Sequence, residues 1–161
     1  MRRIACLLTG IAALAGCGSD PADVAGDYTI AVTSRDNGCD LTNWQEGATA
    51  QGIMVEITQS GGNASADVAG IVGGLLDTWL GSSVFTGSVD GSSILLELVG
   101  TTMYSQGTCD YTFDAEIDAE IDGDVLTGFI RYRAVTDDSN ECGSLTGCES
   151  VQEFNGTRPP T

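Results

Sequence analysis

The chain has 161 residues, and 23 acidic residues against 6 basic ones give it a net charge of −17 at pH 7. So negative a chain repels nucleic acid and anionic lipid headgroups, and we expect neither as a partner. It contains no histidine and no lysine, which removes the commonest general base and the amine nucleophile. It also lacks a Gly-x-Ser-x-Gly motif, so we expect no catalytic residues, no cofactor and no enzymatic activity.

The first twenty residues, MRRIACLLTGIAALAGCGSD, have the layout of a secretory signal. A pair of arginines precedes an apolar run from Ile4 to Ala15, which is too short to span a bilayer as a mature helix. The sequence Leu14-Ala15-Gly16-Cys17 resembles the lipobox of bacterial lipoproteins. The resemblance implies that residues 1–16 are a signal peptide and that Cys17 becomes the acylated first residue. Two or three acyl chains are enough for stable anchoring in a membrane.

Cys17 is followed by Gly18 and Ser19, with no Asp directly after the cysteine. In lipoproteins of Gram-negative envelopes an Asp there often marks retention in the inner membrane. The resemblance therefore implies a cell-envelope protein held in the outer membrane by its lipid. Residues 17–25 would form a lipidated tether, and residues 26–158 are long enough for a single domain with its own core.

Four cysteines remain in the expected domain: Cys39, Cys109, Cys142 and Cys148. An even number in an exported chain predicts two disulfides. A four-thiolate zinc site is the alternative, but Cys39 and Cys109 lack the close paired spacing that such sites usually show. Of the three possible connectivities we favour Cys142–Cys148, which closes the last loop on itself, with Cys39–Cys109.

After residue 25, segments of alternating apolar and polar residues are separated by Gly, Asn, Asp and Ser, which predicts β-strands joined by turns. We expect eight strands, at about 27–33, 53–58, 64–69, 85–89, 94–99, 111–121, 125–136 and 150–156. This number of regularly spaced strands predicts an all-β domain. The expected architecture is an eight-stranded antiparallel up-and-down barrel, and a β-sandwich is the alternative.

Residues 113–124, FDAEIDAEIDGD, place a carboxylate at every second position from Asp114 to Asp122. The residues that follow predict a hairpin. A turn at Asp122-Gly123 would shift the pairing by two and keep the same faces, whereas the other register pairs Asp122 with Val125. This register puts Ile117 opposite Ile130 on the apolar face and Glu116 opposite Arg131 on the polar face. Asp114 then lies opposite Arg133. The acidic row is therefore expected to be a solvated outer face.

Residues 118–125 are similar to the first eight positions of an EF-hand calcium loop. The twelfth position, where that family needs a bidentate Glu, is Phe129. The flanking segments alternate with period two, whereas an EF-hand has a helix on each side. Same-face carboxylates along a strand are about 7 Å apart, too far to share a small ion without help. We therefore expect no metal site.

In an up-and-down arrangement, the short turns at 60–63, 90–92 and 122–124 share one end of the domain. The longer connections at 34–51, 70–83, 100–110 and 137–149 share the other. This asymmetry resembles lipocalin-like barrels, as does Gly26-Asp27-Tyr28 at the place of the family's Gly-x-Trp. Arg158 follows the last strand, where the family sets an Arg across that aromatic ring. Here the Trp is a Tyr, and the family's middle motif is absent.

Residues 71–81, IVGGLLDTWLG, have a spacing of apolar side chains that predicts a short helix at the long-loop end. The helix would be either a lid packed on the barrel or a mobile wall of an apolar ligand site. The candidate ligand-mouth residues are Trp44, Leu75, Leu76, Trp79 and Leu80. We thus expect a lipid-anchored, non-catalytic protein that binds a small apolar ligand; the alternative is a structural or protein-binding surface lipoprotein. The sequence indicates no particular protein partner.

Overall fold

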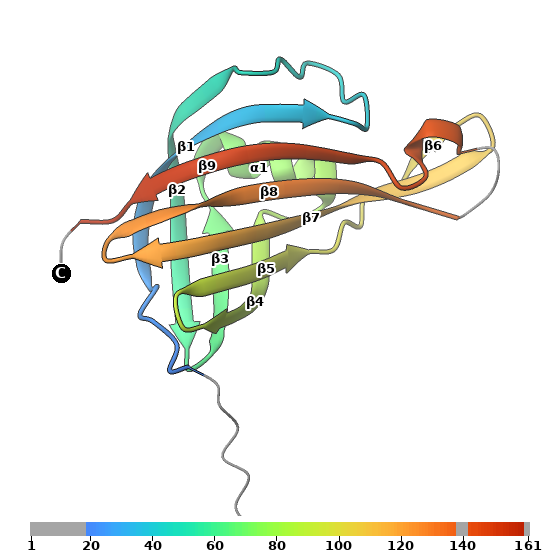
Figure 1. Ribbon diagram of the computed structural model, residues 1–161. Helices are drawn as coiled ribbons and strands as arrows, with labels where there is room; N and C mark the ends of the chain where they lie inside the picture. Colours follow the sequence, from blue (N-terminus) through green and yellow to red (C-terminus); the bar gives the residue numbers. More distant parts are fainter. Residues whose placement is uncertain (1–18, 138–141, 160–161) are drawn as a thin grey trace, which may run out of the picture.

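The computed structural model describes residues 19–137 and 142–159 (Figure 1). The expected signal peptide and Cys17 lie outside these residues. The described elements are β1 (Gly26–Asn37), β2 (Thr49–Ser60), β3 (Asn63–Val68), α1 (Gly70–Leu80), β4 (Val84–Asp90), β5 (Ser93–Leu98), β6 (Tyr104–Gln106), β7 (Cys109–Asp122), β8 (Val125–Thr136), the 3₁₀ turn η1 (Gly143–Leu145) and β9 (Glu149–Thr157).

The strands form one antiparallel sheet that closes on itself. Their order is β5-β4-β3-β2-β1-β9-β8-β7-β6, and β5 also pairs with β7, so that eight strands complete a barrel and β6 lies outside the ring. The first and last strands meet through the β1–β9 ladder. The predicted lipocalin-like, up-and-down barrel is confirmed, and the alternative sandwich is wrong because β5 pairs with β7 and closes the ring.

All eight predicted strands are present, but β1 and β2 extend further into their connection than the sequence indicates. The added residues are mostly polar, so they carry no alternation of apolar side chains. Backbone pairing holds them instead: Ser34 pairs with Gln152 of β9, and Thr49 pairs with Thr33 of β1. Strand β6 was not predicted, because its three residues are too few to show an alternating pattern; it forms a small hairpin with β7.

Of the two registers that the sequence allows, the β7–β8 hairpin has the one with its turn at Gly123-Asp124. Asp122 pairs with Val125, Ile117 with Ile130 and Glu116 with Arg131. Gly123 in the turn has a φ of 60°, which favours glycine. The acidic side chains lie on the outer face, where Arg131 contacts Glu116 at 3.6 Å and Asp118 at 3.3 Å. The segment similar to an EF-hand loop is therefore a β-hairpin with an ion-paired outer surface.

The short-turn end of the barrel, at residues 61–62, 91–92 and 123–124, is covered by the segment before β1. Val24 and Tyr28 are fully buried there, and the guanidinium of Arg158 lies 5.9 Å from the centre of the Tyr28 ring. Arg158 also donates hydrogen bonds to Asp124 and to the carbonyl of Ala25. The Tyr–Arg contact expected from the lipocalin resemblance is thus present.

Residues 19–25, expected to be a tether, are docked on the same end. The amide of Ala22 donates to the carbonyl of Gly91 at 2.7 Å, and the Ser19 hydroxyl donates to Asp90 at 2.9 Å. The Gln59 side chain accepts from the amide of Val24 and donates to the carbonyl of Ala22. The chain therefore enters the barrel at its short-turn end.

Two disulfides lie at the opposite, long-loop end, and their connectivity differs from the prediction. Cys39 bonds to Cys148, and Cys109 bonds to Cys142. The favoured pairs Cys142–Cys148 and Cys39–Cys109 were wrong. The first was chosen because its cysteines are close in sequence, and the second because the two remaining cysteines lie in loops at the same end of the barrel. In the barrel, the Cys39–Cys148 bridge instead joins the turn after β1 to the start of β9, and the Cys109–Cys142 bridge joins the start of β7 to the loop after β8.

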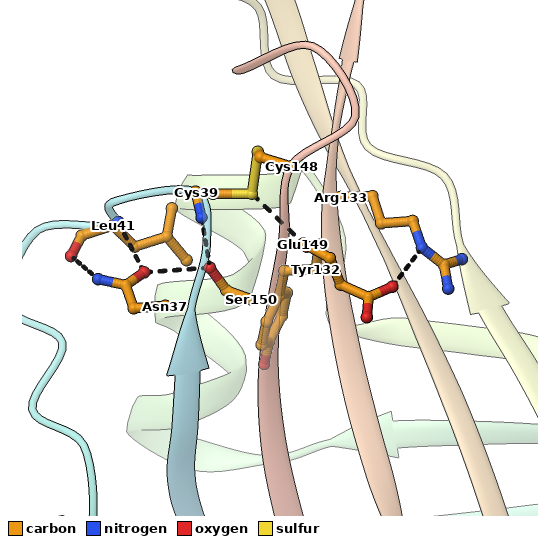
Figure 2. The surroundings of a disulfide bond; sticks show 8 residues. All are labelled: Asn37, Cys39, Leu41, Tyr132, Arg133, Cys148, Glu149 and Ser150. Atoms are coloured by element: carbon orange, nitrogen blue, oxygen red, sulfur yellow. Dashed lines mark hydrogen bonds and ion pairs between the residues drawn. A yellow bond between two sulfur atoms is a disulfide. The ribbon is translucent and has the colours of Figure 1, made fainter. Parts of the chain in front are cut away.

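A buried polar cluster supports the Cys39–Cys148 bridge (Figure 2). The hydroxyl of Ser150, a fully buried side chain, accepts from the amide of Cys39 at 3.1 Å and donates to Asn37 at 3.0 Å. Asn37 in turn accepts from the amide of Leu41 and donates to its carbonyl. These bonds satisfy the backbone groups of the turn that leaves β1, which fixes the bridge against the start of β9.

Candidate ligand cavity

The barrel encloses a cavity of about 340 Å³. This volume lies in the lower part of the range found for small-molecule sites, about 300–1,000 Å³. Its wall is mainly aliphatic and aromatic, and it is built from inward-facing residues of most barrel strands and from α1. The lining residues are Ile30, Val32, Ser34, Ala48, Thr49, Ala50, Ile53, Val55, Ile57, Ala66, Val68, Val72, Leu76, Phe85, Ile94, Leu96, Ile117, Ala119, Leu126, Ile130, Tyr132, Gln152 and Phe154.

The space arises from small side chains at inward positions. Ala66 of β3 and Ala119 of β7 are buried and line the cavity, each where a larger residue would fill it. Gly128, opposite Ala119 on β8, has a different role: a Cβ there would lie 2.4 Å from the carbonyl oxygen of Asp118 and 2.7 Å from the Ala119 Cβ. Small residues on β7 and β8 therefore both leave space and allow close strand packing.

Helix α1 forms one wall of the cavity at the long-loop end. It begins after Ala69 and ends at Gly81, which has a φ of 92°. Its inner face contributes Val72 and Leu76 to the lining. Gly73 lies between them against the end of β3, where a Cβ would be only 1.9 Å from the carbonyl oxygen of Val68. Only glycine allows this approach, so the sequence holds the helix close over the barrel.

The five predicted mouth residues take different positions. Leu76 lines the cavity, whereas Leu80 is buried but not part of the lining, and Leu75 is 63% exposed on the outer face of α1. Trp79 packs its ring 5.0 Å from Tyr132 and 5.4 Å from Phe113. Trp44 makes an edge contact with the same Tyr132 ring at 6.3 Å, and its indole N–H donates to the carbonyl of Arg35. The two tryptophans thus support a lining residue from behind.

Polar groups gather on one side of the cavity, toward its long-loop end. The Tyr132 hydroxyl donates to the side-chain oxygen of Gln152 at 2.9 Å, and the Gln152 amide nitrogen lies 3.4 Å from the Ser34 hydroxyl. These three side chains come from β8, β9 and β1, and we call them the polar triad. Burial raises the pKa of Tyr132, so its phenol stays protonated and neutral at physiological pH.

The sequence did not single out the polar triad. Its members are 20 and 118 residues apart along the chain, and they meet only because β1, β9 and β8 are neighbours in the closed barrel. The one available signal was position: each lies on the inward face of its strand by alternation, where a polar residue is unusual.

Charged groups stay outside the cavity, since its lining includes no Asp, Glu or Arg. Every arginine in residues 19–137 and 142–159 forms an ion pair with a carboxylate: Arg35 with Glu153, Arg131 with Glu116 and Asp118, Arg133 with Glu116 and Glu149, and Arg158 with Asp23 and Asp124. Among the described residues, no three His, Cys, Asp or Glu side chains form a group that could hold a metal ion.

The fold and the cavity together define a lipocalin-like β-barrel with an apolar interior that is polar along one side. Comparison of the chain with protein-family models, curated proteins and solved structures finds no match. Within residues 19–137 and 142–159, a helix able to cross a bilayer is not found.

Proposed function

We propose that this protein is a lipid-anchored, non-catalytic lipoprotein of the bacterial cell envelope that binds a small apolar ligand inside its barrel. The observation that carries the proposal is the apolar cavity of about 340 Å³. A pocket of this size and lining binds ligands mainly by removing apolar surface from water, which contributes roughly 25 cal/mol per Å² buried.

The anchor part of the proposal rests on the lipobox-like sequence ending at Cys17 and on where the described chain begins. Ser19 is bonded to Asp90 at the short-turn end. Two residues span at most about 7 Å, so a lipid on Cys17 would lie at that same end. The long-loop end, with α1 and the polar triad, would then point away from the membrane that holds the anchor. We propose that this is the outer membrane.

Binding is tested with N-phenylnaphthylamine, a neutral apolar dye that fluoresces in apolar surroundings. We expect the wild-type protein to bind it saturably at one site. Ala66→Leu and Ala119→Leu each place a larger side chain in the cavity and should weaken binding at least about tenfold, because the dye must displace or compress that side chain. Ala31→Leu is the matched control, since Ala31 lies on the outward face of β1.

Two outcomes would contradict the proposal: no saturable binding by the wild-type protein, or unchanged affinity in both cavity variants. Either result would favour the alternative function, a structural or protein-binding lipoprotein without a small-molecule ligand. Melting curves of each variant separate loss of the site from loss of the fold.

A further inference from the structure

The lining of the cavity changes from apolar to polar along its length, and this change restricts the class of ligand that fits. Toward the short-turn end its wall is wholly apolar, as at Ile57, Ile94 and Leu126. Toward the long-loop end the lining includes Ser34, Thr49, Gln152 and Tyr132. Because strands β1 and β8 run toward that end, Ser34 and Tyr132 both lie in the part nearest the long connections.

The polar triad has hydrogen-bonding capacity beyond its internal bonds. A serine hydroxyl that accepts one hydrogen bond can still donate one, a primary amide carries two N–H donors, and a phenol oxygen that donates can also accept. The structure uses one amide donor of Gln152 on Ser34 and the phenol proton of Tyr132 on Gln152. A ligand hydroxyl, carbonyl or ester near these groups could therefore both accept and donate.

The same site is unsuited to a charged ligand. An ion moved into an apolar cavity loses its hydration, and this cost is recovered only by a partner of opposite charge. No charged side chain lines the cavity, and the described arginines are held by carboxylates on the outer surface. The strong negative charge of the chain further disfavours anions such as fatty-acid carboxylates.

We infer that the ligand is an uncharged amphiphile, with an apolar body in the floor of the barrel and a neutral hydrogen-bonding group held by Ser34, Gln152 and Tyr132. This inference deepens the proposed function and rests on it. The burial that raises the pKa of Tyr132 supports it, because a neutral phenol accepts and donates hydrogen bonds without attracting a counter-ion.

The test is displacement of N-phenylnaphthylamine by three probes that share one alkyl chain: decanol, decanoate and decylammonium, near neutral pH. Decanol should displace the dye at a concentration at least about tenfold lower than either ion needs, because each ion must lose its hydration without a partner. If either decanoate or decylammonium displaces the dye at the same concentration as decanol, the inference is wrong.

Variants test whether the polar triad makes the difference. Gln152→Leu and Tyr132→Phe should each reduce decanol affinity by about three- to tenfold, the range for loss of a neutral hydrogen bond. Their affinity for N-phenylnaphthylamine should stay close to that of the wild type, since the dye makes no demand on these groups. Tyr111→Phe is the control, because Tyr111 lies outside the cavity lining.

The proposed function and the inferred ligand class are contradicted by different results. If the wild-type protein does not bind the dye, the proposed function is wrong and the inference falls with it. If the dye binds but Gln152→Leu and Tyr132→Phe leave decanol affinity unchanged, the cavity is a binding site and the inferred ligand class is wrong. Should either variant unfold, as shown by its melting curve, the decanol and decanoate comparison on the wild-type protein still decides.

Discussion

Gly73 sets the distance between α1 and the barrel. Its neighbour Gly74 is exposed, and a Cβ there would meet nothing within 4 Å, whereas a Cβ on Gly73 would collide with the carbonyl oxygen of Val68. The two glycines thus have opposite roles in one short helix. At Gly73 the missing side chain allows close packing, while at Gly74 it only lowers the propensity of the helix to form.

This difference predicts opposite effects of the same substitution. Gly73→Ala should lower the free energy of unfolding by about 1–3 kcal/mol, because the helix or β3 must shift to admit the methyl group. Gly74→Ala should raise it by about 0.5–1 kcal/mol through helix propensity. Urea denaturation measures both. A stabilising effect at both positions would show that α1 does not pack against Val68 in solution.

At the scale of elements, the two disulfides fasten pairs of neighbouring strands. The Cys39–Cys148 bridge joins β1 to β9, the place where the beginning and end of the chain meet, and closes a loop of 109 residues. The Cys109–Cys142 bridge joins the start of β7 to the loop after β8, and because these two strands already form a hairpin it closes a loop of only 33 residues. The first bridge therefore restricts the unfolded chain more than the second.

Removal of the bridges should follow that order. In the chain-entropy model, replacing Cys39 and Cys148 by Ala costs about 1 kcal/mol more than replacing Cys109 and Cys142, because the loop is longer. Guanidinium unfolding of the two double variants under oxidising conditions measures the difference. A larger loss from the Cys109–Cys142 pair would contradict the view that closure between β1 and β9 dominates.

Strand positions were predictable where one face is apolar and the other polar, as in β7 and β8, whose inner and outer faces follow from alternation. They were not predictable where backbone pairing alone decides, as in β6 and the polar ends of β1 and β2. The disulfide connectivity depended on which strands are neighbours. Local spacing around Cys142 and Cys148 contains no information on that point.

At the scale of the whole molecule, the two ends of the barrel differ. The short-turn end is closed by Val24, Tyr28 and Arg158, and it receives the incoming chain. The long-loop end has α1, both disulfides and the polar side of the cavity. A helix at residues 71–81 and an apolar ligand site beside it were expected from the sequence, but the size of the cavity was not predictable, because it depends on how Ala66, Ala119 and α1 pack around a shared space.

The proposed anchor makes a prediction about the whole protein in a cell. When the full chain is expressed in a Gram-negative bacterium, Cys17→Ala should move the protein from the membrane fraction to the soluble fraction, because no acyl chains can be attached. Cys6→Ala is the matched control, since Cys6 lies within the expected signal peptide, and it should leave the protein with the membranes. Membrane retention of the Cys17→Ala protein would contradict the lipid anchor.

The central claim is that the barrel holds an apolar ligand inside it. The most direct measurement is a crystal structure of residues 19–161 grown with N-phenylnaphthylamine. We predict that electron density for the dye lies within the barrel, in contact with Leu76 of α1 and with the Ala66 and Ala119 positions. An interior filled by side chains, with the dye absent or bound only on the outer surface, would contradict the claim.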